Sequence, residues 1–159
     1  MDSEYKLYLK RAQNELNLAR IIFKLSIEKN IQINIFKIEE EDTYFSSTIS
    51  HAYYSIFYGA KAYLLTKSIK TKPPEEHKKT FEEFKKLVEE GIIDFELLKI
   101  YEEMLVKADT LLHIFKHEKG KRGKFTYRKL PQANLDPAQE SLKNAMTFFK
   151  HINNLCDIN

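Results

Sequence analysis

The densest cluster of charge in the sequence lies between Lys116 and Lys129. Seven lysines and arginines and a single glutamate give this segment a net charge of +6, whereas the whole chain carries +3 and the remainder therefore −3. Two glycines and the rings of Phe125 and Tyr127 are interleaved with the charges. Cations neutralise phosphates and aromatic rings stack on bases, so the segment is a candidate nucleic-acid contact. The residues best suited to that contact are Arg122, Lys124, Tyr127 and Arg128.

The same composition also fits a plain connection without a binding role. Residues 118–135 show no helical spacing of apolar side chains and are expected to form an irregular basic loop. In that alternative the two rings anchor the loop to the protein while the lysine heads stay in water.

Two histidines, His113 and His117, come just before this loop. Their spacing of four residues places them on the same face of a helix. We expect no metal there, because the sequence shows no third ligand and no HExxH pattern. A catalytic role is a further alternative, with either histidine as general acid–base and Lys107 or Arg122 holding a phosphate. Histidines at a helix end can also simply interact with the helix dipole.

Other polar residues offer weaker candidates. Ser50, Tyr54 and Tyr58 recur on one line of a helix and either border a polar cleft or form the hydrogen-bonded flank of a packed helix. His77, at the start of another helix, is expected to serve packing or capping. Cys156 has no basic neighbour in sequence and no sign of an activated thiolate. Glycine-rich phosphate loops are absent, and we expect no cofactor.

The chain of 159 residues, 43% hydrophobic and 31% charged, is expected to form a single folded domain over residues 1–159. One cysteine cannot form an internal disulfide, and the first residues do not resemble a signal peptide, so a cytoplasmic location is expected. No apolar run approaches the roughly 18–20 residues of a membrane span, so we expect no membrane partner.

Apolar side chains at helical spacing predict an all-α fold, an up-and-down bundle of about five helices. Asp94 and Asp136 are expected as N-caps, and Gly91 as the residue that ends a helix. Residues 30–43, where isoleucines alternate with polar residues, are expected to be an extended connection or a frayed helical extension. The predicted helices cover about residues 3–29, 44–67, 74–90 and 94–117, and a last helix starts at 136.

The predicted second helix is apolar or aromatic on most of its circumference, with Ala52, Tyr53, Ile56 and Ala60 on its broadest face. A helix of this kind is packed from several sides. It is therefore either the central helix of the bundle or the seam of a dimer.

The run from Ser50 to Leu65, SHAYYSIFYGAKAYLL, resembles the "S-x-AYYA-x-F-x-AA-x-A-L-L" helix of HEPN domains. His77 and Phe81 correspond to the family's histidine and phenylalanine after the following turn. The stretch Lys107-Ala108-Asp109 resembles the family's "R-x-AD-Y". The likeness spans roughly residues 3–110 and weakly includes the last helix.

This resemblance implies a compact helical bundle, commonly a homodimer and often encoded beside a small nucleotidyltransferase, as in toxin–antitoxin systems. Many HEPN relatives are RNases in which an arginine holds the phosphate and a nearby histidine performs general acid–base chemistry across a dimer. Here Lys107 stands in place of the arginine, and His113 is the nearby histidine. Lysine lacks the planar bidentate fork of arginine. Thr110 stands where relatives have tyrosine.

We therefore expect a non-catalytic or weakly catalytic HEPN-type module that acts with a nucleotidyltransferase partner, contacts RNA through the basic loop, or does both. One alternative is a metal-independent, toxin-like RNase that uses a histidine and a basic residue. Another alternative is a nucleotide-binding helical bundle.

Overall fold

The computed structural model describes residues 2–112 and 134–158 of the chain. Its elements are α1 (Asp2–Ile27), the short π-helix η1 (Ile31–Ile35), α2 (Phe45–Thr66), α3 (Glu76–Glu89), α4 (Phe95–Leu112) and α6 (Leu135–Asp157). Neither described range contains a β-strand. The predicted all-α fold is confirmed. All five predicted helices begin within two residues of the expected position, and α4 begins directly after the expected cap, Asp94.

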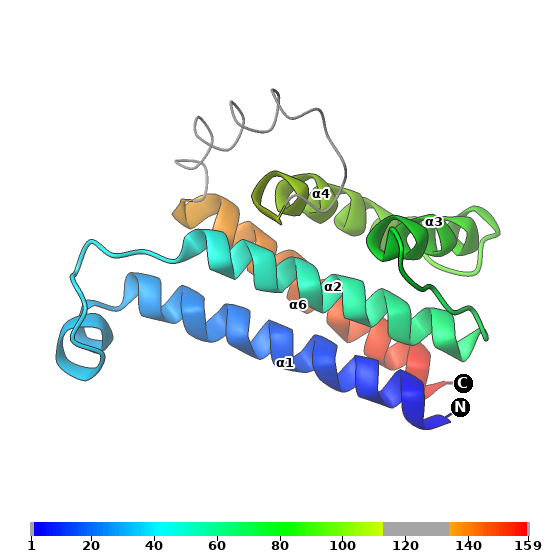
Figure 1. Cartoon of the computed structure of the whole chain (residues 1–159), viewed down its shortest axis with the longest axis horizontal. Coiled ribbons are helices and arrows are strands. Elements are labelled where there is room, and N and C mark those ends of the chain that lie inside the picture. The colour runs from blue at the N-terminus through cyan, green and yellow to red at the C-terminus, as the bar shows by residue number, and fades with distance from the viewer. Residues whose placement is uncertain (1, 113–133, 159) are drawn as a thin grey trace.

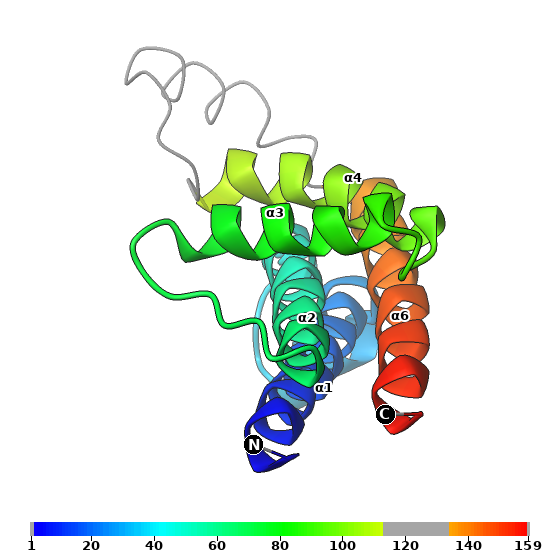
Figure 2. The same cartoon turned by 90° about the vertical axis from the view of Figure 1, so that its right-hand side faces the viewer.

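Three long helices form the body of the molecule. α1 and α2 run antiparallel along their whole length, and α6 lies beside both of them (Figure 1). The hairpin of α3 and α4 crosses this three-helix group and packs on α2 and α6 (Figure 2). α6 runs in the same direction as α2 and opposite to α1 (Figure 1). The described helices form a bundle, but only α1 and α2 alternate in direction along it, and the α3–α4 hairpin lies across the three long helices.

Helix α2 is the centre of the fold, as one of the two predictions for it proposed. It contacts α1, α3, α4 and α6, and thirteen of its 22 residues are buried. Tyr53, Ile56 and Ala60 are completely enclosed. Because apolar side chains surround most of this helix, neighbours must cover it from several sides.

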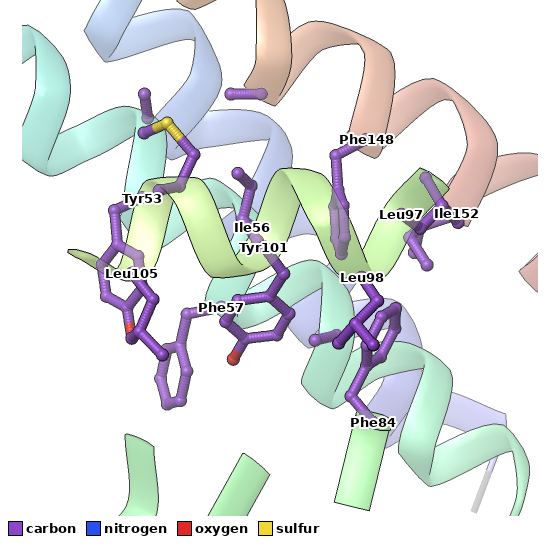
Figure 3. Packing of buried hydrophobic residues seen from close by; sticks show 14 of the residues in the cluster. Tyr53, Ile56, Phe57, Phe84, Leu97, Leu98, Tyr101, Leu105, Phe148 and Ile152 are labelled. Carbon is purple, nitrogen blue, oxygen red and sulfur yellow. The ribbon is translucent and has the colours of Figure 1, made fainter. Parts of the chain in front are cut away.

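A single cluster of buried hydrophobic residues draws side chains from all five described α-helices. Tyr101 and Leu98 of α4 point toward Phe84 of α3 and Phe148 of α6 (Figure 3). The rings of Tyr101 and Phe148 meet edge to face, 5.9 Å apart. The core thus joins the crossing hairpin to the long helices.

Gly59 lies where α2 packs closely on α6. A Cβ placed on Gly59 would lie 3.6 Å from the ring of Phe148 and 3.7 Å from Ile152. These are ordinary van der Waals distances, so α6 packs directly on the backbone of α2 here with room for one methyl group.

Two local expectations are resolved by the structure. Of the two alternatives for residues 30–43, the isoleucines before residue 36 follow the helical one and form the π-helix η1. Gln32 inside it is buried and donates a hydrogen bond to the carbonyl of Asp42 at 2.7 Å. Asp136 is not the N-cap of α6, because the helix already begins at Leu135 with Asn134 as its cap. Asp136 instead lies in the first turn, where the helix dipole favours a carboxylate.

Gly91 ends α3 as expected. Its φ of +76° lies in the left-handed region, and the amide of Ile92 donates to the carbonyl of Leu87 at 2.9 Å. This is the hydrogen-bond pattern of a glycine-terminated helix.

Among the described residues, none of the helices has the length and apolar character required to cross a membrane.

Candidate functional site

Most of the predicted site residues lie outside the described part of the chain. These are His113, His117, Arg122, Lys124, Tyr127 and Arg128, together with the basic loop that contains the last four. Lys107, on α4, is the one member of the predicted set that the structure places.

Lys107 lies where α4 faces α6. Its Nζ is buried, is 3.5 Å from Oε2 of Glu140 on α6, and makes no hydrogen bond to any residue in the described ranges. The ammonium group is therefore turned toward an acidic side chain of the neighbouring helix. Close by on α4, the hydroxyl of Thr110 donates to the carbonyl of Val106 at 3.1 Å. Thr110 thus satisfies its polar group within its own helix.

The residues that carry the family resemblance lie together in space. The hydroxyl of Tyr53 on α2 and Nδ1 of His77 on α3 are hydrogen-bonded at 2.8 Å. The imidazole also stacks on the ring of Phe57, with centroids 4.0 Å apart and planes 21° apart. Phe81, one turn further along α3, packs edge to face on Tyr101. The predicted packing role of His77 is confirmed.

Burial controls the protonation of this pair. Removal from water lowers the pKa of His77; the carboxylate of Glu76 partly opposes this shift, and the ammonium of Lys61 adds to it. Burial also raises the pKa of Tyr53 well above its usual range. Both effects disfavour the charged forms, so the pair is a neutral packing contact at neutral pH.

Of the line of Ser50, Tyr54 and Tyr58, the last residue contacts α1, whereas the ring of Tyr54 packs edge-on against His77 of α3. Arg11 of α1 donates a hydrogen bond to the hydroxyl of Tyr58 at 2.8 Å, and its guanidinium lies 4.2 Å from the centre of that ring. Ser50 donates to the carbonyl of Ser46 in its own helix. These contacts fit the hydrogen-bonded flank that was one of the two predictions for this line.

One turn away, a second polar pair joins the same two helices. Nδ1 of His51 on α2 is 2.6 Å from a carboxylate oxygen of Glu15 on α1. Glu15 and Arg11 are one turn apart on α1, so each supplies one bridge to α2. The bridges tie α1 to α2 along their partly exposed edge.

A hollow of about 180 Å³ opens where α1, α2 and the start of α3 meet. At its edge lies Lys61, which is 5% exposed although it is charged. Its ammonium pairs with Glu76, donates to the carbonyl of Thr71 at 3.3 Å and lies 4.7 Å from the centre of the Tyr8 ring. The hollow is lined by Glu4, Tyr8, Lys61, Leu65, Ile69, Lys70, Thr71, Lys72, Pro73 and Glu76.

Sequence reasoning did not single out this hollow. The available signal was a lone charge, Lys61, between Ala60 and Ala62 on a helix that is otherwise apolar over most of its surface. A lysine in such a position must have an acidic partner or reach water, because an isolated buried charge is costly. The partner, Glu76, was interpreted only as a favourable acidic residue in the first turn of α3.

Metal and thiol chemistry find little support in the described ranges. No group of three or more histidine, cysteine, aspartate or glutamate side chains there is arranged to hold a metal ion. Cys156 is buried, and its burial raises the pKa of the thiol to about 11. A thiol with such a pKa is a poor nucleophile at neutral pH.

Comparison of the chain with models of known protein families and with curated protein sequences yields no match.

Proposed function

We propose that the protein is a HEPN-type helical module that works by binding, to RNA, to a nucleotidyltransferase partner or to both, and that cleaves RNA weakly or not at all. The observation that carries this proposal is the position of Lys107. Its buried ammonium faces Glu140 on α6.

A residue that stabilises a transferring phosphate must direct its N–H groups at the position the phosphate will occupy. Lys107 directs its ammonium into the contact between two helices, where Glu140 offsets its charge. To reach a phosphate, Lys107 would have to leave this ion pair and change its side-chain conformation. The cation expected for RNase chemistry is therefore poorly prepared for it, which favours a binding role.

The packing around His77 supports the HEPN-type part of the proposal. Tyr53, Phe57, His77 and Phe81, which carry the resemblance in the sequence, all belong to the packed contact between α2, α3 and α4. If these residues pack together in HEPN domains as well, the same packing would explain why this chain and those domains share the residue types and their spacing.

RNA contact is assigned to the basic loop on the strength of its sequence. Its charge of +6 and its two rings suit a single strand, with Arg122, Lys124 and Arg128 on phosphates and Tyr127 stacked on a base. A homodimer and the nucleotidyltransferase partner belong to the same proposal and rest on the family resemblance.

Cleavage is tested by incubating the purified full chain with single-stranded RNA in EDTA. We expect the RNA to remain intact, while a metal-independent RNase in a parallel sample degrades it. The proposal is wrong if the protein cleaves RNA and the cleavage disappears in His113→Ala or His117→Ala. That outcome would establish the RNase alternative.

Binding is tested by measuring RNA affinity over a range of salt concentrations. The slope of log K against log salt should fall by about 2 when Arg122, Lys124 and Arg128 are all changed to glutamine, since each phosphate contact on a single strand contributes about 0.7. A matched control changes three exposed lysines elsewhere, Lys85, Lys99 and Lys143. Equal slopes in the two triple variants would leave the basic loop without a specific role.

The partner and the dimer need separate measurements. One chain has a mass of 18.9 kDa, and sedimentation of the purified protein should give twice that mass. Co-expression with the product of a neighbouring nucleotidyltransferase gene should yield a complex that survives gel filtration. A monomer that forms no such complex would remove this part of the proposal while leaving RNA binding to be judged by its own test.

A further inference from the structure

The hollow at the junction of α1, α2 and α3 has a buried cation in its wall. Lys61 comes from the C-terminal part of α2 and loses nearly all contact with water. Burying an ammonium costs several kcal/mol unless its hydrogen-bonding capacity is met. Glu76, the carbonyl of Thr71 and the face of the Tyr8 ring meet it here.

The charges around the hollow do not balance. Lys61 pairs with Glu76, and Lys70 pairs with Glu4 at 2.8 Å, so both acidic residues of the lining are already engaged. Lys72 also lines the hollow and forms no ion pair within the described ranges.

A further lysine stands beside the opening. Nζ of Lys79 on α3 donates to the backbone carbonyl of Lys72 at 3.2 Å, so Lys79 lies beside Lys72, although it is not itself a lining residue. Within residues 2–112 and 134–158 it forms no ion pair either. Two lysines at or beside the opening are therefore not engaged in ion pairs within the described ranges.

We propose that this hollow binds a small oxyanion of the phosphate class. Lys72 and Lys79 attract and hold the anion at the opening, while Lys61 stays paired with Glu76 and adds its positive charge from the wall. At about 180 Å³ the space suits one phosphoryl group, whereas pockets for whole drug-sized ligands measure roughly 300–1,000 Å³. The group is either free phosphate or the end of a larger molecule whose remainder stays outside.

Glu76 makes this site distinguishable from an ordinary basic surface. Its carboxylate, whose side chain is 28% exposed, competes with an incoming anion for Lys61. Replacing it by glutamine removes the competing charge but keeps a similar shape. Glu76→Gln should therefore bind the anion more tightly, because Lys61 is then the nearest uncompensated charge.

The test is isothermal titration of the full chain with inorganic phosphate, repeated with sulfate. We expect affinity to fall about tenfold in the double variant Lys72→Gln/Lys79→Gln and to rise about tenfold in Glu76→Gln. A control pair, Lys85→Gln/Lys99→Gln, removes the same charge from exposed lysines that do not line the hollow and should leave affinity unchanged. Circular dichroism checks that each variant is folded at the temperature used.

A second arm separates the two sources of the phosphoryl group. A ribo-oligonucleotide with a 5′-phosphate is compared with its 5′-hydroxyl counterpart in the same variants. Tighter binding of the phosphorylated form that depends on Lys72 and Lys79 identifies a terminal phosphate as the ligand, whereas response to inorganic phosphate alone identifies the free ion.

The inference is wrong if neither probe binds to the wild type or to Glu76→Gln. It is equally wrong if the double variant at Lys72 and Lys79 and the control pair lose affinity to the same extent, since any lysine-rich surface would then suffice. The outcome does not depend on RNA binding by the basic loop. The phosphate titration contains no RNA, and in the oligonucleotide comparison the loop meets the phosphorylated and the hydroxyl form alike.

Discussion

The hydroxyl of Tyr53 on α2 lies 2.8 Å from Nδ1 of His77 on α3, although the two residues are 24 positions apart in the chain. The imidazole is held at the same time against Phe57. This contact connects the aromatic part of α2 to the first turn of α3. It therefore fixes the corner at which the crossing hairpin leaves the long helices, next to the hollow that contains Lys61.

The protonation of His77 should make stability depend on pH. Burial lowers its pKa in the folded protein below the ordinary value of 6.5, so in the interval between the two values the unfolded chain binds a proton that the folded chain does not. Stability is complete above about pH 6.5 and falls as the pH decreases through this interval. Thermal unfolding of the wild type and of His77→Gln over this range should show a steeper acid loss in the wild type. Parallel curves would contradict the prediction.

Two buried tyrosines should respond in opposite ways to removal of their hydroxyl groups. Tyr53→Phe leaves Nδ1 of His77 without its partner and should lower the free energy of unfolding by about 1–2 kcal/mol. The hydroxyl of Tyr101 is buried and has no hydrogen-bond partner among residues 2–112 and 134–158, so Tyr101→Phe should be neutral or stabilise by up to about 1 kcal/mol. Urea unfolding of the two variants measures the difference, and equal destabilisation by both would show that Tyr101 has a partner in solution.

Gly59 should accept one methyl group and nothing larger. Alanine at this position places its Cβ at normal contact distance from Phe148 and Ile152, and it removes the cost of glycine inside a helix. We expect Gly59→Ala to stabilise the fold by about 0.5–1 kcal/mol. Gly59→Leu should instead destabilise it by about 1–3 kcal/mol through overpacking. The pair is checked by thermal unfolding, and a loss of stability in the alanine variant would mean that α6 lies closer to α2 than described.

The ion pair of Lys61 and Glu76 should show strong energetic coupling. Glu76→Gln leaves the buried ammonium without its carboxylate and should lower the free energy of unfolding by about 2 kcal/mol. Lys61→Met should cost less, because the remaining carboxylate is partly exposed and can be hydrated.

The double variant isolates the coupling. Lys61→Met/Glu76→Gln should be closer to the wild type than the sum of the two single changes, since neither charge is then left alone. Additive effects in chemical denaturation would show that the two side chains do not form a pair in solution.

Much of the secondary structure could be predicted from the sequence, because helix signals are local. The spacing of Ala12, Leu16 and Ala19 indicated the buried face of α1, and Gly91 indicated the end of α3. Where a local signal had two interpretations, the sequence did not choose between them. The isoleucines around Gln32 alternate like a strand, but without a partner strand the backbone satisfied its hydrogen bonds in a π-helix.

The candidate site was much less predictable. Lys107 was predicted to hold a phosphate because of its place in the motif. In the structure its ammonium faces Glu140 on another helix. Lys61 and Glu76 were known only as a charge on α2 and an acidic residue on α3. A periodic pattern indicates which side of a helix is covered, but it does not identify the covering residue.

The sequence by itself therefore determined an all-helical chain, the approximate ends of its helices and the coverage of α2 from several sides, because hydrophobic spacing and terminal residues act within one helix. That α2 lies at the centre of the bundle was decided by the tertiary structure. Only the tertiary structure decided that the α3–α4 hairpin crosses the long helices and that Arg11 meets Tyr58, 47 residues away. The same crossing brings Glu76 to Lys61 at the edge of a hollow. Such contacts depend on the angles and distances at which whole helices pack, and these are set by all the buried side chains together.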